Sequence, residues 1–148
     1  MTDRSPLPDH SGNEEPARQV AALVWRPGPG EVDVLLVTSR ETGRWLVPKG
    51  WMVDGKTAIA SALQEAYEEA GALAEPSERL LGSYGYDKIL KDGSVMPCAV
   101  DVFAVPLLRV LDRWPEMNQR KRRWYSAGTA ASLVREPGLA DLLRQFEG

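Results

Sequence analysis

The hydrophobic residues of this chain gather in short runs separated by turn-forming residues, a pattern typical of β-strands. Five runs predict strands, and they cover residues 19–25, 32–38, 45–47, 80–88 and 95–107. The second run is apolar enough to be buried on both faces, and Pro48 ends the third. A turn around Asp92 and Gly93 joins the last two runs into a hairpin.

Between these strands, residues 57–70 have the composition and periodicity of an α-helix. Ala, Leu, Glu and Gln dominate the segment, Thr57 can cap its start, and Gly71 can end it. At about 100° per residue, one narrow stripe of the helix is apolar and is expected to face the core. This stripe contains Ile59, Leu63, Ala66 and Ala70. Two shorter helices are predicted at 127–134 and 139–146, and strands on both sides of a central helix favour the α+β fold class.

The chain is predicted to be one domain behind a short tail. Its 148 residues fit a single domain, and its 43% hydrophobic and 26% charged residues are ordinary for a globular protein. Residues 1–16 are rich in Pro, Ser and Asp, so we expect a disordered tail at 1–16 and a folded domain at 17–148. No run approaches the roughly 20 apolar residues of a membrane span, and the first residues lack the apolar core of a secretory signal. With Cys98 as the single cysteine, we expect a cytoplasmic protein without a disulfide.

Charge is distributed unevenly along the chain, and its distribution is more informative than the net charge of −3. That net charge argues against broad electrostatic capture of nucleic acid. However, residues 120–123 form a basic cluster, and Glu65, Glu68 and Glu69 form an acidic one in the predicted helix. A site that holds both a metal ion and phosphate groups needs clusters of both signs.

The three glutamates are expected to lie side by side, because residues three and four apart are neighbours on a helix. Gln64, Ala66 and Tyr67 stand beside them, so no neighbouring cation relieves the repulsion. Mg²⁺ would relieve it, since this ion prefers oxygen ligands and binds through a few carboxylates together with substrate phosphates. A solvated acidic helix face without a metal is the structural alternative.

The residues around the helix favour the metal site. Gly50 follows Pro48 and Lys49 in a loop, and a glycine lets the backbone approach a ligand closely. The run 50–72, GWMVDGKTAIASALQEAYEEAGA, resembles the Nudix box, which reads Gly, five residues, Glu, seven residues, then Arg-Glu-apolar-x-Glu-Glu-x-Gly-apolar. The box positions are occupied here by Gly50, Glu65, Glu68, Glu69 and Gly71.

Two positions depart from the box. Lys56 stands where the family has Glu, and Gln64 stands where it has Arg. In the family these two residues typically pair and hold the loop against the helix. Because both are replaced together, no orphaned charge remains, and Lys56 can still donate a hydrogen bond to Gln64. We therefore expect the activity that the carboxylates support to survive.

The flanking segments resemble one branch of this family, the diphosphoinositol polyphosphate phosphohydrolases and their bacterial relatives. Residues 35–40 and 43–48 are similar to that branch before the box, and residues 112–125 are similar to its basic motif after the box. Dinucleoside polyphosphate hydrolases, a neighbouring branch, also carry Pro-Lys-Gly before the helix. Arginine binds phosphate oxygens in a bidentate fork. The residues expected to bind the substrate are Ser39, Arg40, Lys49, Arg120 and Lys121.

The resemblance implies a Nudix-type α/β/α sandwich with a mixed central sheet, and a metal-dependent hydrolase that cleaves a pyrophosphate linkage in a phosphorylated small molecule. The implied ion is Mg²⁺, or Mn²⁺ in its place, and its expected ligands are the Gly50 carbonyl and the catalytic residues Glu65, Glu68 and Glu69. The general base comes from the helix or from a later loop, where the candidates are Asp87, Asp92 and Glu116. A binding-only nucleotide or polyphosphate sensor with a degenerate box is the alternative function.

Overall fold

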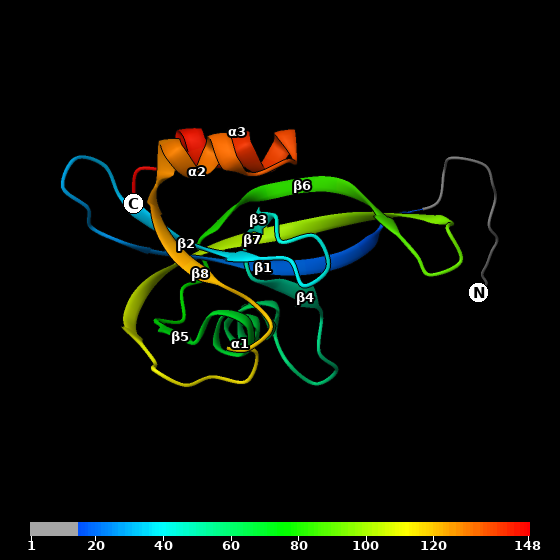
Figure 1. Ribbon diagram of the computed structural model, residues 1–148, viewed down its shortest axis with the longest axis horizontal. Coiled ribbons are helices and arrows are strands. Elements are labelled where there is room, and N and C mark those ends of the chain that lie inside the picture. Colours follow the sequence, from blue (N-terminus) through cyan, green and yellow to red (C-terminus); the bar gives the residue numbers. More distant parts are fainter. Residues whose placement is uncertain (1–14) are drawn as a thin grey trace.

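A computed structural model describes residues 15–148 and shows a mixed sheet between two helical layers (Figure 1). The helix α1 (Ala58–Ala70) covers one face, and α2 (Ala127–Leu133) with α3 (Pro137–Gln145) covers the other. The predicted α/β/α sandwich is therefore confirmed. The predicted tail, 1–16, lies outside the described residues except for Glu15 and Pro16. Within the described part of the chain, no helix has the length and apolar character that a membrane crossing requires.

The described residues form an eight-stranded sheet. The strands are β1 (Ala17–Arg26), β2 (Asp33–Thr38), β3 (Trp45–Leu46), β4 (Lys49–Trp51), β5 (Ala72–Ala74), β6 (Leu80–Ile89), β7 (Val95–Val110) and β8 (Arg122–Ser126). Each of the five predicted strands is present. The strands that the sequence pattern missed are β4, β5 and β8, which are short and lack an alternating apolar pattern.

The pairing of β1 determines where the loop before α1 lies. β1 runs parallel to β7, from Ala17 opposite Cys98 to Trp25 opposite Pro106, and the other strand pairs are antiparallel. At its end β1 pairs with β2, whereas residues 19–21 near its start pair with β4. The chain thus leaves β1 along β2, returns to it along β4, and enters α1 beside the middle of the sheet.

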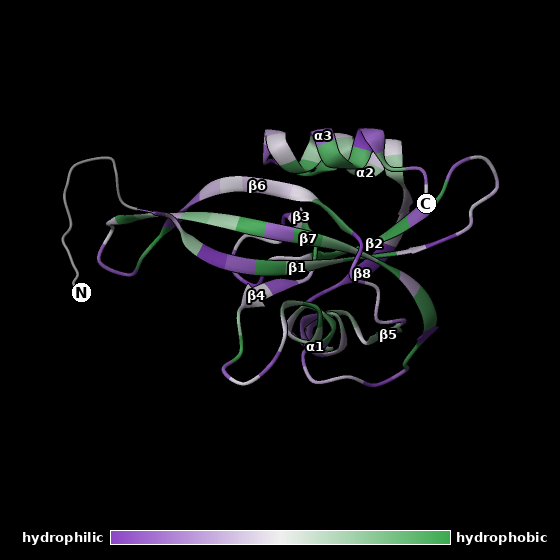
Figure 2. Ribbon diagram, turned by 180° about the vertical axis from the view of Figure 1, so that it is seen from behind, coloured by the Kyte–Doolittle hydropathy of each residue, from purple (hydrophilic) through white to green (hydrophobic). Residues whose placement is uncertain are grey.

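Two apolar layers hold the helices against the sheet. Under α1, Ala66 and Ala70 of the predicted stripe are fully buried, while Ile59 and Leu63 pack at its margin. On the opposite face, α3 buries Leu139 and Leu143 completely, and burial of one such side chain contributes about 1.5–3 kcal/mol. Figure 2 shows hydrophobic residues along the strands between the helical layers.

Both ends of α1 follow the prediction. The Thr57 hydroxyl accepts a hydrogen bond from the backbone N–H of Ala60 at 3.1 Å, which caps the first turn. Gly71 ends the helix with a φ of 62°, a left-handed conformation that favours glycine. A Cβ atom at Gly71 would also lie 2.7 Å from the ring of Trp114. The end of α1 is therefore in close contact with the segment that precedes β8.

Candidate active site

Gly50 brings the loop before α1 into contact with the first glutamate of the box. It lies in β4 opposite Val20 of β1, and a Cβ atom on it would lie 2.5 Å from the carboxyl carbon of Glu65. Any side chain at this position would displace the Glu65 carboxylate, so the approach requires glycine. The backbone of Gly50 and the carboxylate of Glu65 are thus direct neighbours.

Glu65 and Glu69 form a carboxyl pair one helical turn apart. Because they are four residues apart in α1, their carboxyl groups lie close enough to act on each other, and Glu69 Oε1 accepts a hydrogen bond from the backbone N–H of Lys49 at 3.4 Å. Burial raises the pKa of Glu69 to about 8, and it also raises the pKa of Glu65. Buried carboxyl groups that disfavour ionisation gain strongly from a nearby cation.

Glu68 has a different partner. Gln64 Nε2 donates a hydrogen bond to Glu68 Oε2 at 2.7 Å, and the Gln64 oxygen accepts one from the Lys56 ammonium. Within residues 15–148, no group of three His, Cys, Asp or Glu side chains is arranged to hold a metal ion. Of the three predicted ligands, the structure joins Glu65 to Glu69 and pairs Glu68 with Gln64.

The residues present nevertheless fit a divalent cation. The Gly50 backbone, Glu65 and Glu69 place hard oxygen donors in one small volume, and Mg²⁺ prefers such donors. Glu68 follows on the same helix and joins this set if its carboxylate leaves Gln64.

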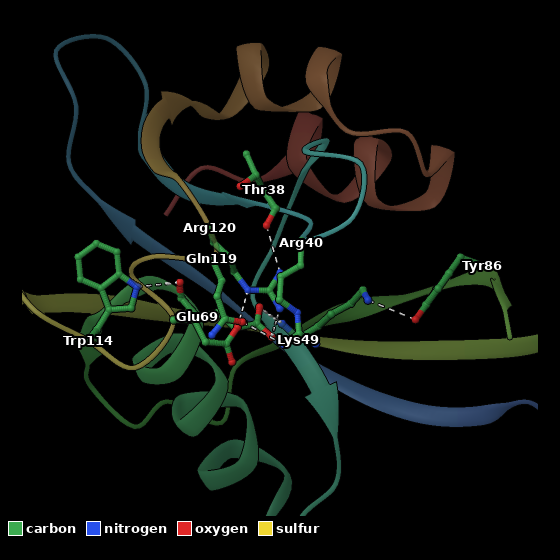
Figure 3. A network of polar contacts seen from close by, with 9 residues as sticks. Thr38, Arg40, Lys49, Glu69, Tyr86, Trp114, Gln119 and Arg120 are labelled. Carbon is green, nitrogen blue, oxygen red and sulfur yellow. Dashed lines mark hydrogen bonds and ion pairs between the residues drawn. The ribbon is translucent and has the colours of Figure 1, made fainter. Parts of the chain in front are cut away.

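Arg120 reaches Glu69 of the carboxyl pair from the segment before β8 (Figure 3). Its guanidinium donates to the Thr38 carbonyl at 3.1 Å and to Glu116 Oε1 at 2.7 Å, and Nη2 lies 3.5 Å from Glu69 Oε2. The Arg120 side chain is only 10% exposed. The expectation that no neighbouring cation relieves the acidic helix is therefore wrong, because a cation arrives from a distant part of the chain.

Ser39 and Arg40 lie in the turn after β2. Hydrogen bonds between Ser39 and Arg44 close this turn, with the Ser39 N–H donating to the Arg44 carbonyl at 2.8 Å and the Arg44 N–H donating to Ser39 Oγ at 3.1 Å. Arg40 is exposed, and its Nη1 donates to Gln119 Oε1 at 3.2 Å (Figure 3). An exposed guanidinium next to the Arg120 segment is accessible to a phosphate group.

Lys49 connects the carboxyl pair to β6. Its backbone N–H is bound to Glu69, whereas its Nζ donates to the Tyr86 hydroxyl at 3.2 Å. That hydroxyl donates in turn to Gln19 Oε1 at 2.7 Å. Burial lowers the pKa of Lys49, and the charge of Glu69 opposes this effect. Lys49 is therefore a half-buried cation between the acidic helix and the sheet.

Lys121 is exposed, although its backbone N–H is bound to Thr38 Oγ1 at 2.8 Å. Beside it lies a surface hollow of about 480 Å³ with an aromatic and basic lining. The lining residues are Trp45, Trp114, Arg120, Lys121, Arg122 and Arg123. A lining of this kind suits an anionic ligand.

Of the three candidates for a general base in a later loop, Glu116 is the one that lies against the acidic helix. Its backbone N–H donates to the Glu68 carbonyl at 3.0 Å, and its charge acts on both Glu65 and Glu69. The other two candidates, Asp87 and Asp92, are exposed on β6 and in the β6–β7 turn.

Trp114 lies in the segment 112–125 that resembles the basic motif, but the sequence pattern indicated no role for it at the site. Its indole N–H donates to the Glu69 carbonyl at 3.1 Å, and the guanidinium of Arg122 lies 3.8 Å from its ring centre. Arg122 Nη1 also donates to the Ala70 carbonyl at 2.9 Å. A single tryptophan among turn residues gives no periodic signal, so only the tertiary structure reveals this contact.

Comparison with known proteins agrees with this architecture. The chain is 31% identical over 125 residues to Nudix hydrolase 21, chloroplastic, of Arabidopsis thaliana, a match that covers 80% of this chain and 59% of the relative. It is 28% identical over 134 residues to diphosphoinositol polyphosphate phosphohydrolase 3-alpha of Mus musculus, covering 88% of this chain and 77% of the relative. The chain spans about three fifths of the length of the plant relatives it matches. No protein-family model matches it.

The fold has close counterparts among solved structures. A binary complex of the C. elegans Ap4A hydrolase matches with a TM-score of 0.64 at 21% identity, over 86% of this chain and 93% of that one. The sandwich and its box helix are therefore those of the Nudix fold, and the proteins that the chain resembles in sequence are Nudix hydrolases. They include the diphosphoinositol polyphosphate phosphohydrolases.

Proposed function

We propose that the protein is a metal-dependent hydrolase that cleaves a pyrophosphate linkage in an organic diphosphate of the diphosphoinositol polyphosphate or dinucleoside polyphosphate type. The observation that carries this proposal is the carboxyl pair of half-buried Glu65 and buried Glu69 against the backbone of Gly50. The names of two similar proteins, a diphosphoinositol polyphosphate phosphohydrolase and an Ap4A hydrolase, support the two substrate types.

In this proposal, the Gly50 carbonyl and the carboxylates of Glu65, Glu68 and Glu69 hold Mg²⁺, or Mn²⁺ in its place. A divalent cation there supplies charge neutralisation for substrate phosphates and makes water more acidic. For this role Glu68 gives up the partly buried hydrogen bond that it accepts from Gln64.

The basic residues around the carboxyl pair bind the phosphates of the substrate. Arg40 and Lys121 are exposed and offer charged donors, Ser39 offers a hydroxyl in the turn next to Arg40, and the backbone of Lys49 is bonded to Glu69 of the acidic helix. Arg120 differs from these four, because its guanidinium is nearly buried and bonded to protein groups.

Hydrolysis then needs one proton acceptor. Water attacks one phosphorus, the P–O bond to the bridging oxygen breaks, and that oxygen leaves with the second phosphate. The water proton passes to a carboxylate, either on the box helix or at Glu116. Glu116 is supported as the loop-borne candidate because its charge acts on both Glu65 and Glu69.

We further propose that the protein acts in the cytoplasm on a phosphorylated small molecule. Its single cysteine, Cys98, is buried in β7 and free, in keeping with a reducing compartment. Some similar plant proteins carry mitochondrial or chloroplastic names, so fractionation of cells that express a tagged full chain tests this location.

A substrate panel tests the function. Wild type and Glu69→Gln are incubated with diadenosine tetraphosphate or a diphosphoinositol polyphosphate, with Mg²⁺ or with a chelator, and products are followed by ³¹P NMR. Metal-dependent product from the wild type and loss of it in Glu69→Gln support the hydrolase. Retention of substrate without product supports the sensor with a degenerate box instead. If the wild type neither forms product nor retains substrate, the result supports an acidic helix with a purely structural role.

A further inference from the structure

All three guanidinium nitrogens of Arg120 have partners inside the protein. Nε donates to Glu116, Nη1 donates to the Thr38 carbonyl, and Nη2 faces the Glu69 carboxylate (Figure 3). With 10% of its side chain exposed, Arg120 has little surface left for a substrate phosphate. Its geometry is that of an internal fork that joins three segments: the end of β2, the box helix and the loop before β8.

Arg120 also supplies a charge that the box itself lacks. Gln64 is neutral at the position where the Nudix pattern has arginine, and it is engaged with Lys56 and Glu68. The ammonium of Lys56 is therefore directed to Gln64, and the cation at Glu69 comes from Arg120. Without it, Glu69 would face Glu65 and Glu116 as like charges in a buried setting, which is costly.

We infer that Arg120 is a positioning residue that holds Glu69 and Glu116 in place at the carboxyl site, in the role of an internal counter-charge supplied from outside the box. This inference rests on the proposed hydrolase function and gives Arg120 a different task from its exposed neighbour Lys121. A group that orients carboxylates affects the chemical step, whereas a group that contacts substrate phosphates affects substrate binding.

Steady-state kinetics separate these two tasks. Arg120→Met is expected to lower kcat by about 10- to 100-fold and to leave KM within about threefold, because misplaced carboxylates slow the reaction of bound substrate. Arg120→Lys keeps one charge but not the three-sided fork, so its kcat is expected between those of wild type and Arg120→Met. Lys121→Met is expected to show the opposite pattern, a raised KM with kcat nearly unchanged. Arg113→Met, at an exposed position of the same segment, is the control and leaves both constants unchanged.

A raised KM at unchanged kcat in Arg120→Met would overturn the inference, because it would place Arg120 on the substrate. Equal losses of kcat in Arg120→Met and Arg113→Met would overturn it as well, because the loss would then be general to the segment.

Thermal unfolding of the metal-free protein tests the same contact without turnover. The variants are Arg120→Met, Glu69→Gln and the double variant, all measured in chelator at pH 9, where Glu69 carries its charge. Arg120→Met is expected to lower Tm, and this loss should be at least about 2 °C smaller in the Glu69→Gln background, because the counter-charge then has one carboxylate fewer to hold. Identical losses in both backgrounds would show that the two residues are not coupled and would overturn the inference.

The unfolding cycle also separates this inference from the proposed function. If the wild type hydrolyses no substrate in the panel, the proposed hydrolase fails while the cycle still reports whether Arg120 holds Glu69. If hydrolysis is present and the cycle shows no coupling, the inference alone fails.

Discussion

The ammonium of Lys56 donates a hydrogen bond to the side-chain oxygen of Gln64, so the two residues that depart from the Nudix pattern are in direct contact. Gln64 extends this contact to Glu68 through its amide nitrogen. A polar chain thus runs from the loop before α1 to a predicted metal ligand. The two departures are therefore one compensated replacement of a charge pair by a charged and a neutral partner, and they leave no isolated charge.

Restoring the family residues one at a time should destabilise the protein, and restoring both should not. Gln64→Arg alone places a second cation beside Lys56, and Lys56→Glu alone places a carboxylate beside Gln64 near an acidic face. The double change recreates an ion pair, with an expected coupling of about 0.5–3 kcal/mol. Thermal unfolding of wild type and the three variants measures this coupling. Additive effects would contradict the contact and would strengthen the case for a degenerate, binding-only box.

The box carboxylates should be needed for turnover and dispensable for folding. Glu68→Gln or Glu69→Gln is expected to reduce turnover by about two orders of magnitude or more, through the loss of charge stabilisation at the metal. Stability of Glu68→Gln should be unchanged or slightly higher, because repulsion among Glu65, Glu68 and Glu69 falls, whereas Glu69→Gln gains this relief but also loses its ion pair with Arg120. Initial rates at saturating Mg²⁺ and melting curves provide the two measurements. Near-normal turnover in both variants would rule out the metal assignment.

The metal-free protein should lose stability as the pH rises from about 5 to about 8. Burial raises the pKa of Glu69 from 4.5 to about 8, so between these values the folded protein holds a proton that the unfolded chain has released. Proton binding by the folded state stabilises it at low pH, and this contribution disappears as the pH passes the folded pKa. Glu69→Gln should flatten the profile, as measured by Tm in chelator at several pH values. Because the charges of Glu65 and Glu69 act on each other, the protonation of one affects that of the other, and Glu65→Gln should flatten the profile in part. An equally steep profile in Glu69→Gln would assign the slope to other groups.

Arg40 should distinguish substrates by their number of phosphates. It is exposed at the end of β2 and is held beside the Arg120 segment by its bond to Gln119. Arg40→Ala is expected to weaken binding of a highly phosphorylated substrate by about tenfold, and binding of a simple nucleoside diphosphate derivative by much less. Inhibition constants for the two ligand types in both proteins give the comparison. Equal weakening for both would mean that Arg40 shapes the turn and does not contact additional phosphates.

The turn that carries Arg40 is anchored by a buried ion pair, and its loss should cost stability. Arg44 Nη2 lies 2.8 Å from Glu136 Oε2 at the start of α3, with side chains 23% and 7% exposed. Glu136→Gln is expected to cost about 2–3 kcal/mol, somewhat less than the roughly 3–5 kcal/mol of a fully buried pair, because Arg44 retains some contact with water. Urea denaturation measures this loss.

Tyr84→Phe provides the matched contrast. Within residues 15–148, the Tyr84 hydroxyl is buried without a hydrogen-bond partner, so its removal should change the free energy of unfolding by less than about 0.5 kcal/mol or should stabilise the protein. A loss above about 1 kcal/mol in Tyr84→Phe would show that the hydroxyl has a partner in solution.

Most of the fold could be predicted from patterns within single segments of the sequence. The features that could not be predicted depend on contacts between distant segments. The box helix was recognisable because Thr57 and Gly71 mark its ends and alanines mark its buried face. The strand β8 was not recognisable from the sequence, because it begins with basic residues and its extended conformation depends on pairing with β2. The contact between Arg120 and Glu69 could not be predicted either. It joins residues far apart in the sequence, and a pattern within one segment contains no information about it.

The parallel pairing of β1 with β7 has a consequence for the order in which the protein becomes stable during synthesis. The partner of Ala17 is Cys98 and the partner of Trp25 is Pro106, so the first strand leaves the ribosome long before the strand that completes its ladder. The acidic helix is made in between, and its counter-charge at Arg120 follows later still. A nascent chain that ends before residue 98 therefore exposes an unpaired strand edge together with an uncompensated carboxyl pair. Stable folding of this protein is accordingly expected only once nearly the whole chain has been synthesised.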